Sequence, residues 1–151
     1  MFKISIRELK NMLKQYVPKD YYILWVLEEA IYRGSRYLEL FYNVNPIVSL
    51  TLEINTVSGE EVNVQGIKVI VRRENAEKHR VQWNKVLVDL RNNLLKISIL
   101  YRESEDQIYA IIDVKDSIQM NNVVKEITHK LRDLGFKIPE EIKIIGYDYM
   151  E

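Results

Sequence analysis

The stretch EVNVQGIKVIVRR, residues 61–73, decides how the rest of the chain is arranged. Apolar and polar residues alternate along it, as expected of a β-strand with one buried face. The alternation changes phase at Gly66, so that the apolar residues fall at even positions before this glycine and at odd positions after it: Val62 and Val64, then Ile67, Val69 and Val71. A β-bulge or a bend at Gly66 is the simplest explanation, because it lets both halves face the same core.

The segment before this strand predicts a β-hairpin. Residues 47–57 alternate with period two, and Ser58-Gly59 supplies the turn that leads into Glu61. Residues 36–42 show the same period, although a helix continuing to Phe41 is the competing interpretation. We therefore expect residues 36–60 to form an extra β-hairpin.

Residues 1–34 predict a helical hairpin. Ser5-Ile6-Arg7-Glu8 has the spacing of a capping box, so the first helix begins at Ile6 and ends at Pro18. A second helix is expected over residues 21–33. It is apolar on nearly all sides in its first two turns, which favours burial between layers or between subunits. The large side chains expected to make these contacts are Tyr21, Tyr22 and Trp25.

The remainder predicts two more helices and three more strands. In order, these are a helix from Asn75 to Asn93, strands over 94–102 and 107–115, a helix from Ser117 to Gly135 and a strand over 142–147. The apolar stripe of the first of these helices is Ala76, Trp83, Val86, Leu87, Leu90 and Leu94.

From residue 61 onward the order is therefore β, α, β, β, α, β, which is the split βαβ or ferredoxin-like arrangement. We expect a single α+β domain with a helical hairpin (1–34), an extra β-hairpin (36–60) and a ferredoxin-like part (61–147). An antiparallel meander with helices on one face is the alternative. The first strand is central in the ferredoxin-like arrangement, whereas here it also needs residues 47–57 as a neighbour.

Composition excludes several classes of protein. The chain has 151 residues, 47% of them hydrophobic, which is too many for a disordered chain. It has no cysteine, so disulfides and thiolate zinc sites are excluded. Its 22 basic and 22 acidic residues cancel, so no overall charge attracts it to nucleic acid or membranes. No apolar run reaches the ~20 residues of a membrane-spanning helix, and we expect a cytoplasmic protein with no membrane partner.

The period of two assigns the side chains of the late strands to two faces of the sheet. We expect helices to cover the apolar face: Val69, Val71, Leu95, Ile97, Ile99, Ile108, Ala110, Ile112, Ile142 and Ile144. The opposite face then carries six cations: Lys68, Arg72, Lys96, Arg102, Lys115 and Lys143. Tyr109, Tyr147 and Asp113 share this face with one aliphatic residue from each strand: Ile70, Leu100, Ile111 and Ile145.

Three interpretations of this second face compete. In the first, which we favour, the N-terminal helices seal the aliphatic residues and the cations reach past them to solvent. In the second, the face binds nucleic acid, with cations on phosphates and with Tyr109 and Tyr147 stacked on bases. The strands lack the aromatic-rich pattern of an RNA-recognition motif. In the third interpretation, another copy of the protein covers the face.

Asp113-Val114-Lys115 is the arrangement that suggests catalysis. Many metal-dependent nucleases place a carboxylate and a lysine two residues apart, where the carboxylate holds Mg²⁺ and the lysine steadies the attacking water or the phosphate. Asp89 or Asp106 would supply the second carboxylate. Composition explains the pair more simply, since roughly two acid-x-lysine spacings are expected by chance and three are present.

The remaining motifs predict neither a cofactor nor a metal site. His79 and His129 fall on different helices without a carboxylate at ligand spacing, and no glycine-rich phosphate loop occurs. We therefore expect a non-catalytic assembly or adaptor module that binds a protein partner or itself. Nucleic-acid binding through the cationic face is the first alternative, and a Mg²⁺-dependent nuclease using Asp113 and Lys115 is the second.

Overall fold

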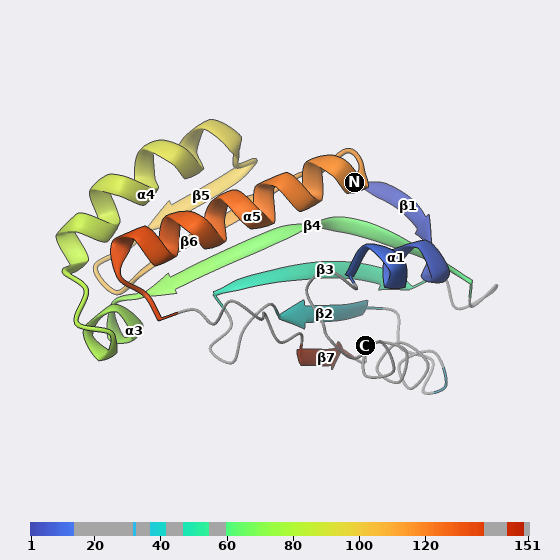
Figure 1. Ribbon diagram of the computed structural model, residues 1–151, viewed down its shortest axis with the longest axis horizontal. Helices are drawn as coiled ribbons and strands as arrows, with labels where there is room; N and C mark the ends of the chain where they lie inside the picture. The colour runs from blue at the N-terminus through green and yellow to red at the C-terminus, as the bar shows by residue number, and fades with distance from the viewer. Residues whose placement is uncertain (14–31, 33–36, 42–46, 55–59, 138–144, 150–151) are drawn as a thin grey trace.

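A seven-stranded antiparallel sheet is the centre of the computed structural model, which describes residues 1–13, 32, 37–41, 47–54, 60–137 and 145–149 (Figure 1). Its strands are β1 (Phe2–Ser5), β2 (Tyr37–Phe41), β3 (Val48–Ile54), β4 (Glu61–Arg72), β5 (Leu100–Glu103), β6 (Gln107–Ile112) and β7 (Ile145–Tyr149). The described helices are α1 (Ile6–Leu13), α3 (Arg73–Lys78), α4 (Trp83–Ile97) and α5 (Ser117–Leu134). The prediction of an α+β protein is confirmed.

Strand β4 contains the predicted bulge. Thr51 of β3 pairs with Gly66 whereas Leu52 pairs with Val64, so Gln65 is the extra residue. Both apolar sets of β4 are consequently buried on one side of the sheet. Glycine is required at position 66, because a Cβ there would lie 2.7 Å from the carbonyl oxygen of Ile112 on β6.

The ferredoxin-like layout is not confirmed. The strand order is β5-β6-β4-β3-β2-β7, with β1 paired to β4 beyond the end of β6. Strands β6 and β5 lie where that layout puts them, but β3 occupies the other side of β4 and β7 lies at the far edge, beside β2. The reason is that β3 precedes β4 directly and pairs with it along nearly its whole length, which leaves no free edge for the last strand. Strands β2, β3 and β4 form a meander.

The predicted helical hairpin is not confirmed, although its first helix begins where expected. Helix α1 begins at Ile6, and the Oγ of Ser5 accepts a hydrogen bond from the backbone N–H of Glu8 (3.1 Å), as a helix cap does. The helix expected over residues 21–33, with Tyr21, Tyr22 and Trp25, lies outside the described residues. Residues 2–5 form a strand, β1, that the pattern did not predict.

The single helix expected from Asn75 to Asn93 is two helices. Arg80 has a φ of 59°, and after α3 the N–H groups of Arg80 and Val81 donate to the carbonyls of Glu77 and Ala76. This is a Schellman ending, which is normally built on glycine. The buried residues Trp83, Val86, Leu90 and Leu94 then define the inner side of α4.

The strand expected over residues 94–102 is wrong in its first half. Helix α4 continues to Ile97, because the side chain of Asn93 donates to the carbonyl of Asp89 (3.0 Å) and does not interrupt the helix. Strand β5 begins only at Leu100. Leu95, Ile97 and Ile99, which were expected to be covered by helices, are exposed.

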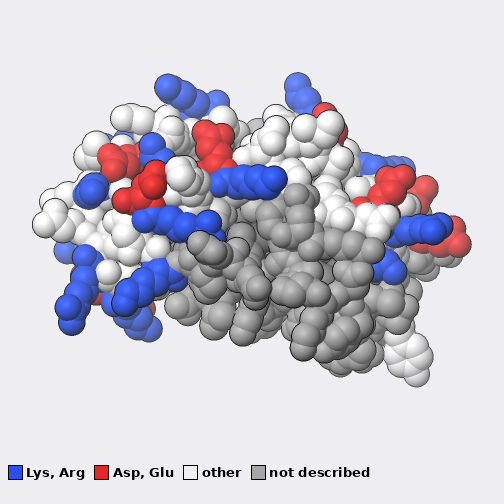
Figure 2. All heavy atoms as spheres, in the orientation of Figure 1, with Lys and Arg blue, Asp and Glu red and all other residues white. Residues whose placement is uncertain are grey.

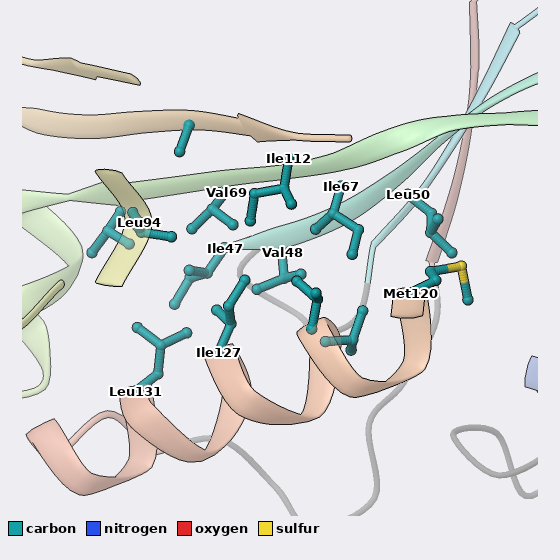
Figure 3. Packing of buried hydrophobic residues seen from close by; sticks show 14 of the residues in the cluster. Ile47, Val48, Leu50, Ile67, Val69, Leu94, Ile112, Met120, Ile127 and Leu131 are labelled. Atoms are coloured by element: carbon teal, nitrogen blue, oxygen red, sulfur yellow. The ribbon is translucent and has the colours of Figure 1, made fainter. Parts of the chain in front are cut away.

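Helix α5 covers the side of the sheet on which the apolar core lies (Figure 3). Asp116 caps its first turn by accepting from the N–H of Gln119 (2.7 Å), and Gly135, at a φ of 110°, ends it as predicted. Met120, Ile127 and Leu131 point from α5 toward the buried side chains of β3, β4 and β6 (Figure 3). The buried residues of the late strands, Val69, Val71, Ile108, Ala110 and Ile112, lie where the period of two predicts.

None of the described helices is long and apolar enough to cross a membrane.

Candidate functional site

The candidate site lies on the sheet face that α5 does not cover, across β4, β6 and β5. We call this surface the open face and define it by the side chains that alternate with the buried ones: Lys68, Ile70, Arg72, Gln107, Tyr109, Ile111, Leu100 and Arg102. Arg72 and Arg102 are exposed, and the other six side chains, including Tyr109, are half-buried. None of the eight is acidic. The face anticipated from the period of two therefore exists along these three strands.

The same side of the sheet is buried at Glu39 of β2 and Ser49 of β3. Glu39 and Ser49 are 1% and 3% exposed, and the Oγ of Ser49 donates to a carboxylate oxygen of Glu39 (2.6 Å). Lys68 reaches across from β4 and places its Nζ 2.7 Å from the same oxygen. The charge of Lys68 is therefore matched by a buried carboxylate, and its main role is to hold three strands together.

Arg72 and Arg102 differ from Lys68 because neither forms an ion pair with another described residue. Tyr109 of β6 has Arg102 directly opposite it on β5 and Ile70 directly opposite it on β4. Arg72 pairs with Gln107, two residues along β6 from Tyr109. Side chains directly opposite in antiparallel strands have Cβ atoms about 5 Å apart, and diagonal ones about 7–8 Å. Tyr109 thus has one exposed arginine directly opposite it on β5 and a second exposed arginine at the diagonal position on β4.

Two shallow depressions adjoin this arrangement and share Gln107. One, of about 680 Å³, is lined by Leu100, Arg102, Glu103, Ser104, Gln107 and Tyr109. The other, of about 540 Å³, is lined by Arg72, Arg73, Glu74, Glu77, Asp106 and Gln107. Exposed basic side chains gather around α3 at this end of the molecule (Figure 2): Arg72, Arg73, Lys78 and Arg80.

The other predicted members of the cationic face do not join the open face in the described structure. Lys96 lies in the last turn of α4, because residues 94–97 are helical, so its expected place on the sheet was wrong. Lys115 lies past the end of β6 in the turn before α5. Lys143 is outside the described residues, and Tyr147 is placed by its backbone alone, opposite Glu39 in β2.

The proposed nuclease residues are poorly placed for a shared metal. Asp113 accepts from the amino group of Met1, and the backbone N–H of Lys115 donates to the side chain of Gln119 (2.7 Å). Asp106 lies at the other end of β6, roughly 20 Å from Asp113 at 3.3 Å per residue, and Asp89 lies on α4. No group of three His, Cys, Asp or Glu side chains among the described residues is arranged to hold a metal ion.

Sequence reasoning missed a polar cluster at the outer edge of the sheet. Arg91 of α4 binds both carboxylate oxygens of Glu103 on β5, with an Nε–Oε2 distance of 2.8 Å. The hydroxyl of Tyr101 donates to the same Oε2 (2.8 Å). Arg91 holds the pKa of Glu103 below its usual value, while burial and the bond to Glu103 raise the pKa of Tyr101 to about 12. The cluster could not be predicted because the expected strand ends at residue 102, whereas Glu103 is the last residue of β5 and faces Arg91.

It also missed an exposed apolar stripe on α4. Val88 and Leu95 are 57% and 54% exposed, and they lie two helical turns apart on the side that faces away from the core. Asp89 and Lys96 follow them immediately, and neither forms an ion pair with another described residue. The available signal was the repeated spacing of seven residues, but the sequence pattern of residues 94–102 predicts a strand, in which this spacing has no meaning.

The two histidines contact neighbouring residues of their own helices and of the core. The Nδ1 of His79 lies 2.8 Å from the carbonyl of Asn75, and its ring packs against Phe136. His129 lies 3.4 Å from Asp133, one turn along α5 on the exposed side, so the expectation of no carboxylate at helical spacing was wrong for this histidine. No third ligand joins this pair among the described residues.

No protein-family model, curated protein or solved structure matches this chain.

Proposed function

We propose that this protein is a non-catalytic assembly module that associates with a second copy of itself through α4. The observation that carries the proposal is the exposed stripe of Val88 and Leu95 together with the charged pair Asp89 and Lys96. Exposed aliphatic side chains at helical spacing on the solvent side of a helix are typical of a helix that packs on another helix.

The stripe is complementary to itself. If two copies of α4 pack antiparallel about a two-fold axis near Asn92, Val88 lies against Leu95 of the partner subunit, and Asp89 lies against Lys96 of the partner subunit. The two-fold axis repeats each contact, so two apolar and two charged pairs form. The charged pairs add little affinity at an exposed rim, but they favour the antiparallel register over the parallel one.

The expected affinity is modest. Helix α4 has 15 residues and is about 22 Å long at 1.5 Å per residue, so a single helix pair buries less than the ~1,600 Å² of a standard interface. We expect a dimer that forms in the micromolar range and not at nanomolar concentration.

Light scattering coupled to size-exclusion chromatography tests this over a concentration series. Leu95→Lys is expected to give a monomer at concentrations where the wild type is dimeric. Ile118→Lys is the matched control, because Ile118 is 72% exposed on α5 and lies outside the proposed interface. A wild type that stays monomeric at the highest soluble concentration, or an equal effect of the two substitutions, contradicts the proposal.

A charge exchange tests the register. Asp89→Lys and Lys96→Asp are each expected to weaken the dimer several-fold, because each places like charges opposite one another across the axis. The double variant restores opposite charges and is expected to regain the wild-type dissociation constant within about twofold. Additive weakening in the double variant contradicts the antiparallel arrangement.

A further inference from the structure

We propose that the open face binds single-stranded nucleic acid, with a base stacked on Tyr109 and backbone phosphates held by Arg72 and Arg102. This inference goes beyond self-association and concerns a different surface. It rests on the neighbourhood of Tyr109, which has Arg102 directly opposite it on β5 and Arg72 at the diagonal position on β4.

The charge of this surface suits a polyanion. Among the eight side chains of the open face there is no carboxylate, and its two arginines have no ion-pair partner in the described part of the chain. Free guanidinium groups bind phosphate oxygens through paired N–H donors. The sheet thus presents a local cationic surface on a chain whose formal net charge is zero.

Nearby carboxylates do not cancel this charge. Four of them border the two depressions beside Tyr109, and three are already bound to a cation. Arg91 binds Glu103, while Arg73 and Lys78 lie 3.4 Å and 3.9 Å from Glu77 and Glu74. The fourth, Asp106, lies in the turn between β5 and β6. Arg72 and Arg102 therefore remain available to an external anion.

The shape of the site favours a single strand over a duplex. A base can stack on an exposed ring only when it is not paired and stacked within a double helix. Ile70, Ile111 and Leu100 surround Tyr109 with aliphatic surface that accepts the faces of bases, and Gln107 offers both a donor and an acceptor to base edges. Three strands span about 10 Å, which is enough for two or three nucleotides.

Fluorescence anisotropy with a labelled oligothymidylate of about 12 nucleotides tests the site. We expect the logarithm of the binding constant to fall linearly with the logarithm of the salt concentration. Arg72→Gln and Arg102→Gln should each reduce the slope by about 0.7, the value for one phosphate contact on a single strand. Lys125→Gln is the matched control, since Lys125 is exposed on α5, on the other side of the sheet.

Tyr109 separates stacking from charge. Tyr109→Ala and Tyr109→Leu are expected to weaken binding about 5- to 150-fold without changing the salt slope, whereas Tyr109→Phe retains binding. The leucine variant keeps apolar bulk in the sheet, so a loss of binding by both variants with unchanged circular dichroism identifies the ring as the cause.

Three results overturn the inference: no binding at about 20 mM salt, equal affinity for a duplex of the same sequence, or binding to phosphatidylserine vesicles but not to the oligonucleotide. Unchanged affinity of Tyr109→Leu also overturns it.

The Leu95→Lys variant is measured in parallel. If it binds the oligonucleotide as the wild type does, the two surfaces are independent, and failure of either proposal leaves the other standing.

Discussion

Glu103 is the residue through which the edge strand β5 is tied to a helix. Its carboxylate accepts two hydrogen bonds from Arg91 of α4 and one from Tyr101 on its own strand. A bidentate guanidinium–carboxylate pair is the ion pair with the most defined geometry in proteins. Because β5 has only four residues and, among the described strands, pairs with β6 alone, this contact positions the edge of the open face.

The pH dependence of stability tests this cluster at its acidic end. The folded pKa of Glu103 is lowered by Arg91, so the stabilisation is present above the ordinary pKa of 4.5 and is lost as pH falls through the folded value. We expect Glu103→Gln to lower the free energy of unfolding at neutral pH and to flatten its decline in acid. Urea denaturation followed by circular dichroism measures both. Parallel curves for wild type and variant would refute the role of Glu103.

Tyr101 gives a second test at the basic end. Its folded pKa is raised to about 12 from 10.0, so its contribution is complete below pH 10 and is lost as pH rises toward 12. Tyr101→Phe has no hydroxyl to ionise and is expected to lose less stability over this window than the wild type. The same denaturation experiment, repeated between these two pH values, decides the matter.

Helix α4 is the element whose extent changes the interpretation of the molecule. Its inner side is defined by Leu90 and Leu94, and its outer side by Val88 and Leu95. Had residues 94–102 formed a strand, Leu95 would be buried under the helices and Lys96 would lie on the open face. In the helix, Leu95 is instead exposed and available to a second copy.

Substitution of two adjacent leucines tests the extent of α4. Leu94 is 1% exposed, and Leu94→Ala is expected to lower the free energy of unfolding by about 2–4 kcal/mol through the lost contacts and the remaining cavity. Leu95→Ala is expected to change it by less than about 0.5 kcal/mol in the monomer. Thermal and urea unfolding measure both, and a larger effect at position 95 would show that these residues form a strand.

Across the whole molecule, the two sides of the sheet are stabilised in different ways. The side under α5 is a continuous apolar core, whereas on the other side the carboxylate of Glu39 on β2 accepts from Ser49 on β3 and pairs with Lys68 on β4. An ion pair with one partner fully buried is not a strong source of stability by itself, but removing one member leaves a charge without compensation. Lys68 is therefore expected to contribute to folding more than to ligand binding.

Replacement of Lys68 tests this role. Lys68→Met is expected to cost about 2 kcal/mol, less than for a fully buried pair because Lys68 retains 24% of its side-chain exposure. Lys68→Arg keeps the charge and should retain most of the stability. Oligonucleotide binding by the folded Lys68→Met protein should stay within about threefold of wild type. A stable Lys68→Met protein that has lost binding would reverse the assignment.

Part of the candidate site followed from the period of two. Lys68, Arg72, Arg102 and Tyr109 occupy one face as expected, because alternation along a strand depends only on backbone geometry. The bulge at Gly66 and the ends of α5 at Asp116 and Gly135 are local in the same sense: each is specified by a few neighbouring residues.

The sequence by itself determined most of the strands and helices, where the long strand bulges and which side chains alternate, since these depend on contacts between near neighbours. Only the tertiary structure decided the strand order, the extent of α4 and the burial of Glu39. Residues 94–100 carry apolar residues that fit either period, so the core beneath Leu94 selected the helix. The β2–β3 hairpin took the edge of β4 because pairing between distant segments is settled by competition for one set of backbone hydrogen bonds.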